Sequence, residues 1–278
     1  MGHLITMFIK IILLFVVTSL FSSTNAFSLT IVEINTEFLW DDDGENEGRV
    51  VTESISTSRY TEELDYYVEL IQRNDAQIVG LIEIEGCQVA ADLKDRLGEE
   101  WKYVCKTGRD NYTGQDVAIL TTFGFTGADN FEDYSSLDGD NRVRPSKVVG
   151  STLSDGVEEY FVVVAHLISQ RSDNDSRRLH QAKAIVKGVN ALKSATTDHV
   201  IVMGDFNDYP ESPPLVELKS LGLINPATAN DCSYTYRRTC RLIDHVLVSE
   251  GIAGGNLDDF KMDERFSDHH ALIYSTHD

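Results

Sequence analysis

The most constraining feature of this sequence is a series of apolar, β-branched segments that end or begin abruptly at a polar residue. Such segments are typical of buried strands. A single polar residue beside a strand is most often a solvated strand end, but a repeated pattern predicts a shared site at the edge of a sheet. We therefore expect one cluster of carboxylates, amides and histidines. The segments adjoin Asn35, Glu83, His166, Asp205, Asp244 and Asp268.

The rest of the chain alternates strand-like and helix-like stretches. A helix capped by Thr61 is expected, followed by one over residues 89–97 and a long one that begins at Asp173 or Asp175. By periodicity alone, the order of elements is compatible with one α/β or α+β domain. Strands are expected over residues 29–34, 78–84, 101–105, 117–122, 147–153, 160–166, 199–203 and 271–274, with two more pieces between 233 and 248.

The first 26 residues are predicted to be a signal peptide. Lys10 precedes an apolar run over residues 11–21, and small residues lead to Ala26. The alternative is a membrane anchor, but the run is short for a span and no basic stop follows it. We expect a secreted protein, extracellular or periplasmic, that is not inserted in a membrane after cleavage. Residues 27–278 then form one domain.

Four cysteines remain after this cleavage, which in an exported chain favours two disulfides. Three pairings can be drawn. The local pairs Cys87–Cys105 and Cys232–Cys240 are favoured because each closes a short loop. The alternative is a zinc site of four thiolates, which would ordinarily show closer spacing within each pair.

The chain is strongly acidic, with a formal net charge of −21. Removal of the first 26 residues, which carry Lys10 and no acid, leaves −22. Phosphate binding normally calls for basic surface, so nucleic acid would be an awkward partner for this chain. The acidic charge is compatible with a local basic patch and bound cations, and it predicts weak affinity and little non-specific retention on DNA. Residues 41–47 form an acidic loop, either simply solvated or a structural Ca²⁺ site.

The residue types at the strand ends suit phosphodiester hydrolysis, which needs a cation to neutralise the phosphate and groups to move protons. The sequence strings around these residues, taken in order along the chain, also resemble the motifs of the endonuclease/exonuclease/phosphatase family. That family includes DNase I-like nucleases, sphingomyelinases and inositol-phosphate 5-phosphatases. The resemblance spans nearly the whole chain after residue 26. Its strings are Ile34-Asn35-Thr36-Glu37, Val79-Gly80-Leu81-Ile82-Glu83, Ala165-His166-Leu167, Gly204-Asp205-Phe206-Asn207-Asp208, Ile243-Asp244-His245-Val246-Leu247-Val248-Ser249 and Ser267-Asp268-His269.

This resemblance implies an α+β fold, a four-layer αββα sandwich whose two packed, mostly antiparallel sheets are flanked by helices. It also implies a Mg²⁺-dependent enzyme, with Mn²⁺ as the expected substitute. Glu83 would be the main ligand, and Asn35 and Asp268 would help to hold the cation, directly or through water.

The same resemblance assigns the proton transfers. His269 would be the general base, oriented by Asp244. Asp205 would lie near the attacking water, with Asn207 on the phosphate or a second cation, both on one side of an extended segment. His166 would bind phosphate or act as general acid, and a His-Leu pair here resembles DNase I-like and sphingomyelinase-like members.

Basic residues outside these motifs are candidates for phosphate binding. Arg144, before a proline, resembles the family's phosphate-binding arginine, and Arg142 is the alternative. Glu37 is a candidate either for supporting the metal ligands or for binding a second metal ion. The candidates for contacts to a nucleic-acid backbone are Arg171, Arg177, Arg178, Arg237 and Arg238, and the alternative for each is ordinary surface charge. Tyr234 and Tyr236 precede the last pair and could pack on sugars or bases, or simply form one face of a strand.

Three functional readings remain open. The favoured one is a secreted, sequence-tolerant DNA endonuclease, expected as a monomer. The second is a phosphoesterase for sphingomyelin, inositol phosphates or a small phosphodiester, although a lipid-active enzyme would need an exposed apolar hairpin that the sequence does not suggest. The third is a binding protein without catalysis, against which the complete set of site residues argues.

Overall fold

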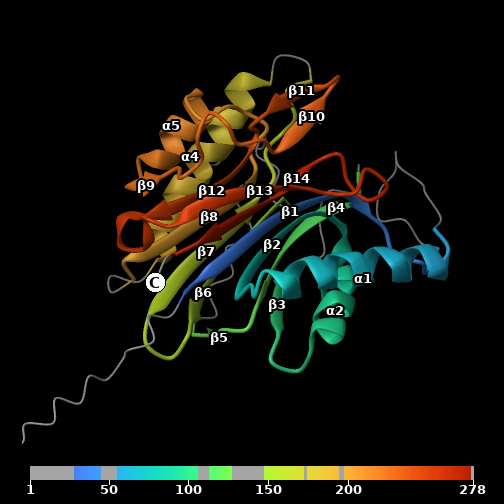
Figure 1. Cartoon of the computed structure of the whole chain (residues 1–278). Coiled ribbons are helices and arrows are strands. Elements are labelled where there is room, and N and C mark those ends of the chain that lie inside the picture. The colour runs from blue at the N-terminus through green and yellow to red at the C-terminus, as the bar shows by residue number, and fades with distance from the viewer. Residues whose placement is uncertain are drawn as a thin grey trace, which may run out of the picture.

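Two six-stranded sheets pack face to face, with helices on the outer face of each (Figure 1). The computed structural model describes residues 28–44, 55–105, 113–126, 147–171, 174–193 and 197–276. The predicted αββα sandwich is confirmed. Most neighbouring strands are antiparallel, and the exceptions among the described strands are the pairs β1–β2 and β7–β8.

The first sheet contains both chain-terminal strands of the domain. Its order is β13 (Asn256–Lys261), β14 (His270–Ser275), β1 (Thr30–Leu39), β2 (Ile78–Glu85), β4 (Gln115–Thr121) and β3 (Lys102–Cys105). The second sheet runs in the order β5 (Gly124–Phe125), β6 (Val148–Ser154), β7 (Glu159–Ala165), β8 (His199–Asp205), β12 (Asp244–Ser249) and β9 (Leu223–Ile224).

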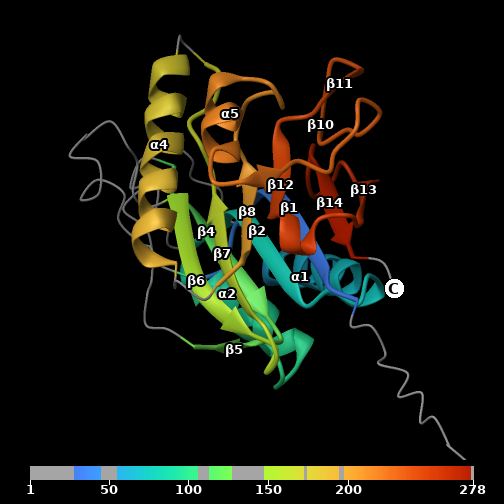
Figure 2. The ribbon, with the colours of Figure 1, turned by 90° about the vertical axis from the view of Figure 1, so that its left-hand side faces the viewer.

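The helices lie on opposite sides of the sandwich, as the two perpendicular views show (Figures 1 and 2). On the first sheet are α1 (Thr57–Arg73) and α2 (Gly86–Leu97), and on the second are α4 (Asp175–Leu192) and α5 (Pro213–Lys219). A short 3-10 turn, η2 (Glu250–Ile252), follows β12. A separate hairpin of β10 (Tyr234–Tyr236) and β11 (Thr239–Arg241) projects at one end.

Three apolar layers hold these elements together, and strand alternation decides which residue enters which layer. On β1, Val32 and Ile34 point to α1 and α2, whereas Ile31 points between the sheets with Met203 and Leu272. A third layer joins α4 and α5 to the second sheet. Both faces of each central strand are therefore buried, which explains their nearly continuous apolar sequences.

The boundaries of some elements differ from the sequence prediction. The first helix begins at Thr57 rather than near Thr61, because Ser56 is the N-cap and Tyr60 is already buried in its first turn. The sequence analysis did not identify α5, although Ser212 followed by two prolines is a typical helix start. It also missed β13, an edge strand whose alternating polar residues hide the pattern.

The two predicted local disulfides are at bonding distance. Cys87 joins Cys105, and Cys232 joins Cys240, each with 5.5 Å between Cα atoms. The pairing excludes a four-thiolate zinc site. The first bond ties α2 to β3, and the second closes the β10–β11 hairpin. In the described part of the chain, we find no helix with the length and apolar character of a membrane span.

Candidate functional site

The predicted polar residues meet at one end of the sandwich because of how the strands are ordered. β1 and β2 are parallel, as are β7 and β8, so residues at or near their carboxyl ends lie at the same end. β12 runs antiparallel to β8, which places its first residue, Asp244, directly opposite Asp205. β14 runs antiparallel to β1 and brings the residues before it, including His269, to the same place.

Glu83 reaches the site through a β-bulge. The register between β2 and β4 shifts between Ile82 and Ile84, and Glu83 itself has a φ of 65°. The extra residue reverses the alternation, since Ile82 packs between the sheets and Ile84 packs toward the helices. The hydroxyl of Thr36 donates to the carbonyl oxygens of Ile82 and Glu83, at 3.0 and 3.1 Å, which holds the bulge. Such a strained position is common at functional sites.

Asp205 is fixed by the turn that follows it. Gly204 has a φ of 139°, and a Cβ there would meet the backbone oxygen of Ala165 at 1.9 Å, so only glycine fits. Asn207 has a left-handed φ of 52°, and its backbone N–H donates to Oδ1 of Asp205 at 2.8 Å. The expectation of an extended segment was therefore wrong. The two side chains approach through a turn, and Nδ2 of Asn207 donates to the carbonyl of Leu167.

His269 and Asp244 form a buried pair. Nδ1 of His269 lies 2.9 Å from Oδ2 of Asp244 and 3.1 Å from its Oδ1. On the other side of the ring, Nε2 lies 3.4 Å from Nδ2 of Asn35. Nδ2 of Asn35 also donates to Oδ2 of Asp205 at 3.2 Å. This contact connects the His269–Asp244 pair to the Asp205 carboxylate.

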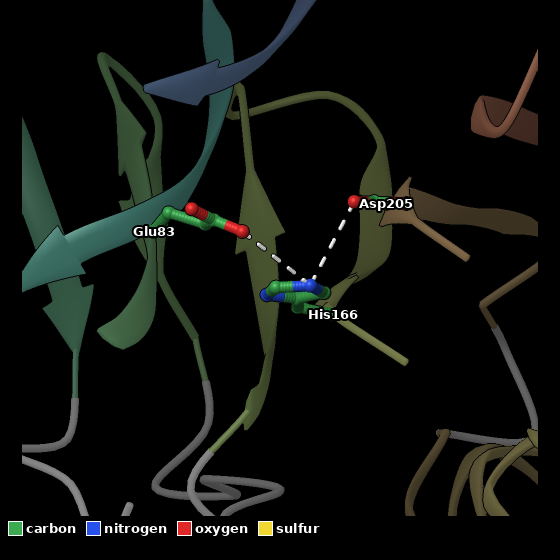
Figure 3. A group of neighbouring side chains, drawn as sticks. All are labelled: Glu83, His166 and Asp205. Carbon is green, nitrogen blue, oxygen red and sulfur yellow. Dashed lines mark ion pairs between the residues drawn. The ribbon is translucent and has the colours of Figure 1, made fainter. Parts of the chain in front are cut away.

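A second group consists of Glu83, His166 and Asp205 (Figure 3). Nε2 of His166 lies 3.6 Å from Oε1 of Glu83 and 3.7 Å from Oδ2 of Asp205. One ligand atom from each of the three residues lies within 4.8 Å of the others. Asp205 also belongs to a second group of this kind, with Asp244 and His269. Both clusters thus share one carboxylate.

Asp268 and Glu37 lie at the solvent side of the site. The backbone N–H of Asp268 donates to Oε2 of Glu37 at 2.7 Å, and Oδ1 of Asp268 lies 3.7 Å from Nε2 of His269. Partial burial and the negative charge of Asp268 raise the pKa of Glu37 to about 7. Glu37 has left-handed backbone, with a φ of 46°, so its side chain leaves the line of β1.

The carboxylates of the site are crowded and buried. Burial, and then the charge of Asp244, raise the pKa of Asp205 well above its ordinary value. Burial also raises the pKa of Glu83, although Lys147 acts in the opposite direction. Glu33, which the sequence analysis did not consider, is fully buried on β1, and burial together with Asp244 raises its pKa. Within the described residues its carboxyl oxygens have no hydrogen-bond partner.

This donor set fits a divalent metal ion. Hard cations prefer carboxylate oxygens, which Glu83 and Asp205 present together beside His166. Asn35 turns its amide nitrogen to Asp205, and its amide oxygen accepts the backbone N–H of Glu37. A bound cation would stabilise the charged forms of these carboxyl groups, and burial without one raises their pKa values. In the described part of the chain, the side-chain groups that could hold a metal ion include no residue of the acidic loop. Residues 45–47 of that loop lie outside the described ranges.

Charge also decides the protonation of His269. Burial lowers the pKa of its imidazole, but Asp244, Asp205 and Asp268 outweigh this and raise the pKa well above its ordinary value. This shift favours the protonated form of the imidazole. A cation among the same carboxylates would reduce their effect on the ring.

Some candidate residues lie elsewhere. Arg144 and Arg142 are outside the described residues. Arg178 is not a nucleic-acid contact, because its side chain is only 2% exposed and its Nε donates to Oδ2 of Asp208 at 2.9 Å. His270, the neighbour of His269, bonds instead to Asp259 and Thr235, which indicates a structural role. Arg237 and Arg238 are exposed at the turn of the β10–β11 hairpin.

Comparison with known proteins identifies a family and several solved structures with a similar fold. The model of the Endonuclease/Exonuclease/phosphatase family matches residues 52–269. A search of curated proteins finds no match. Among solved structures, the 3′ phosphatase NExo from Neisseria, bound to a product DNA hairpin, aligns with a TM-score of 0.65 and 19% identity over 90% of this chain and 99% of its own.

Two further solved structures show the same arrangement. A humanized TDP2 from D. rerio has a TM-score of 0.63 and 13% identity, covering 90% of this chain and 99% of its own. The mannosyl-6-phosphatase Bt3783 from Bacteroides thetaiotaomicron has a TM-score of 0.60 and 17% identity, covering 88% and 98%. At these identities the likeness concerns the fold.

Proposed function

Because the chain belongs to the endonuclease/exonuclease/phosphatase family, whose members hydrolyse phosphoester bonds, we propose that it is a secreted, Mg²⁺-dependent DNA endonuclease of low sequence specificity. The observation that carries the proposal is the meeting of His269–Asp244, Asp205 and the Glu83–His166 pair at one end of the sheets. This set provides a cation site and two histidines within one cluster.

Glu83 is the principal ligand in this proposal, and Asn35 and Asp268 complete the cation's surroundings. When bound, Mg²⁺ neutralises the phosphate and stabilises negative charge as the transition state forms, and Mn²⁺ can replace it. The position of Glu83 on a rigid bulge suits this role, because the backbone fixes where its carboxylate points.

His269 accepts a proton from the attacking water, whose oxygen forms a bond to phosphorus. Asp244 fixes the orientation of the ring and stabilises its protonated form. Asp205 and Asn207 orient the water and the phosphate. The bond from phosphorus to the leaving oxygen then breaks, and His166 donates a proton to that oxygen. Arg144, by motif, contacts the phosphate.

The β10–β11 hairpin favours a nucleic-acid substrate. Tyr234 contacts His269 directly, with ring centroids 4.8 Å apart, so the hairpin adjoins the site. At its far end the Tyr236 ring is 38% exposed and lies under the guanidinium groups of Arg237 and Arg241, at 5.1 and 4.7 Å. Arg237 and Arg238 add positive charge in an otherwise acidic chain. Aromatic and cationic side chains together suit bases and phosphates.

The alternative substrates are phosphate esters of lipids or small molecules, including sphingomyelin and inositol phosphates. In the part of the chain that the structure describes, large exposed apolar side chains are scattered over separate elements, such as Tyr103, Val157 and Val216. A lipid-active enzyme would present them together. This distribution disfavours a lipid substrate.

Secretion is proposed on two grounds. Residues 1–26 have the sequence of a signal peptide, and both cysteine pairs are at disulfide distance, as expected in an oxidising compartment. Residues 27–278 would act as a monomeric domain. A structural Ca²⁺ in the acidic loop remains a further prediction.

Supercoiled plasmid is the decisive substrate. Nicked and then linear plasmid should form with Mg²⁺ or Mn²⁺, and a chelator should stop the reaction. Parallel assays would use a 3′-phosphorylated oligonucleotide, a sugar phosphate, sphingomyelin and an inositol phosphate. Preferential release of inorganic phosphate from a monoester, with intact plasmid, would refute the endonuclease proposal. Sequencing of the signal-processed N-terminus would test export.

A further inference from the structure

Two buried polar side chains, Lys147 and Gln115, form a series of hydrogen bonds that ends at the partly buried Glu83. Nζ of Lys147 donates to Oε1 of Gln115 at 2.8 Å, and Nε2 of Gln115 donates to Oε2 of Glu83. Lys147 directly precedes β6 of the second sheet, whereas Gln115 opens β4 and Glu83 lies on β2 of the first. The series of hydrogen bonds therefore crosses from one sheet to the other. Lys147 and Gln115 are 6% and 4% exposed.

The chemistry of the three groups permits one orientation of the Gln115 amide. An ammonium group only donates hydrogen bonds, and an ionised carboxylate only accepts them. The amide between them must turn its oxygen to Lys147 and its nitrogen to Glu83. Lys147 thereby fixes the donor that faces Glu83.

This arrangement separates the two oxygens of the Glu83 carboxylate. Gln115 contacts Oε2, while Oε1 faces His166 at 3.6 Å on the side where Asp205 also lies. We infer that Gln115 and Lys147 are positioning residues, which hold Glu83 so that Oε1 is presented to the catalytic cation. This inference rests on the proposed function, in which Glu83 is the main metal ligand.

An intervening amide suits this task better than a direct ion pair. An ammonium group bonded to Glu83 itself would compete with the cation for the same lone pairs. The amide donor leaves the negative charge of Glu83 in place, and Lys147 contacts the amide oxygen rather than the carboxylate.

Lys147 also connects both halves of the cation site. Its carbonyl oxygen accepts the backbone N–H of His166 at 2.8 Å. The same residue therefore fixes the backbone at His166 and, through Gln115, the carboxylate of Glu83. Side chains that orient metal ligands in this way typically change metal affinity about 10- to 100-fold when they are replaced.

The test measures cation binding directly, without substrate. Mn²⁺ binding to the full-length mature protein would be followed by electron paramagnetic resonance and calorimetry. Gln115→Met keeps the approximate length of the side chain but removes its donor, and it should weaken Mn²⁺ binding about 10- to 100-fold. Lys147→Met should weaken it in the same direction. At saturating Mn²⁺, turnover of both variants should approach that of the wild type, because the reacting groups are intact.

Thr121→Val is the matched control. Thr121 is a buried polar residue at the opposite end of β4, where its hydroxyl donates to the carbonyl of Gln77. Its loss should reduce the melting temperature but leave the Mn²⁺ dissociation constant unchanged. Unchanged Mn²⁺ affinity in folded Gln115→Met, or an equal loss of affinity in Thr121→Val, would overturn the inference. A wild-type protein that binds no divalent cation would instead overturn the proposed metal site itself.

Discussion

The imidazole of His269 bonds to the carboxylate of Asp244 across the two sheets, because His269 precedes β14 of the first sheet and Asp244 opens β12 of the second. The pair therefore depends on the correct packing of the whole sandwich. The Tyr234 ring packs against the His269 ring. The hydroxyl oxygen of Ser233 accepts hydrogen bonds from the backbone N–H groups of Ile243 and Asp244. The geometry of His269, the proposed general base, is thus fixed before substrate arrives.

Replacement of either partner should reduce catalysis while the protein remains folded, although the loss of a buried partner lowers stability. We expect His269→Ala and Asp244→Asn to lower kcat/KM on plasmid DNA about 10²- to 10⁴-fold, because proton transfer loses its base or the base loses its orientation. His270→Gln is the matched control, since His270 bonds to Asp259 instead. Circular dichroism would confirm folding. Near-normal activity of His269→Ala would show that another group is the base.

The pH dependence of the reaction follows from the raised pKa of His269. The base form appears only as pH increases through that pKa, so kcat/KM should rise with pH on a limb centred above the ordinary histidine value of about 6.5. Asp244→Asn removes the main cause that raises the pKa and should move this limb to lower pH. Higher Mg²⁺ concentration should move it the same way.

The same linkage affects stability in a defined direction. The stabilising effect of the His269–Asp244 pair is fully present below the unfolded-state pKa and is lost as pH rises through the folded-state pKa. Titration of the His269 ring by NMR, without metal, would locate that pKa. A value at or below the ordinary one would contradict the assigned charge environment.

Glu33 should destabilise the fold as pH rises. Its pKa is raised by burial and by Asp244, so its folded-state contribution is most favourable below the ordinary glutamate pKa and worsens above it. Glu33→Gln keeps the shape of the neutral acid, and we expect it to increase the free energy of unfolding by about 1–3 kcal/mol at pH 8 and little at pH 4. Urea denaturation at both values would measure this.

The exposed Glu99→Gln serves as the control for removal of one negative charge from the acidic chain. Equal stabilisation by both variants would mean that net charge, rather than burial of Glu33, causes the effect. Destabilisation by Glu33→Gln at pH 8 would mean that the carboxylate is ionised and bound by a cation or another partner.

Much of the sandwich could be predicted because a buried strand can be recognised from its local sequence alone. The apolar runs around Val79 and Val163 have nearly no polar interruption, and each is a central strand. The site residues could be placed at strand ends for the same reason. Edge elements such as β13 could not be found, since one of their faces meets solvent and their composition resembles that of a loop.

The supporting residues were missed because their role exists only in three dimensions. Nothing around Gln115 or Lys147 marks them locally, and they meet Glu83 only after the two sheets pack. Glu33 shows the opposite case: it interrupts an apolar run two residues before Asn35, and this interruption was a signal of a buried acid on the same side of β1. Arg178 was misassigned because its partner, Asp208, lies 30 residues away.

The charged turn of the β10–β11 hairpin should contribute to DNA binding rather than to bond cleavage. Arg237 and Arg238 have left-handed backbone, with φ of 49° and 67°, a conformation that asparagine tolerates well. The double variant Arg237→Asn/Arg238→Asn should raise KM for DNA about tenfold, equivalent to ~1.4 kcal/mol, without a comparable fall in kcat. If both contact phosphates, the slope of log K against log salt should become shallower by about two.

Two controls separate local binding from bulk charge. Lys94→Gln/Arg96→Gln removes the same charge from α2, where both residues contact surface carboxylates, and should leave KM nearly unchanged. A small diester such as bis(p-nitrophenyl) phosphate is too short to extend from the site to the turn of the hairpin, so its hydrolysis by the Arg237→Asn/Arg238→Asn variant should match the wild type. An equal KM increase in both double variants would assign the effect to net charge and remove the hairpin from the binding surface.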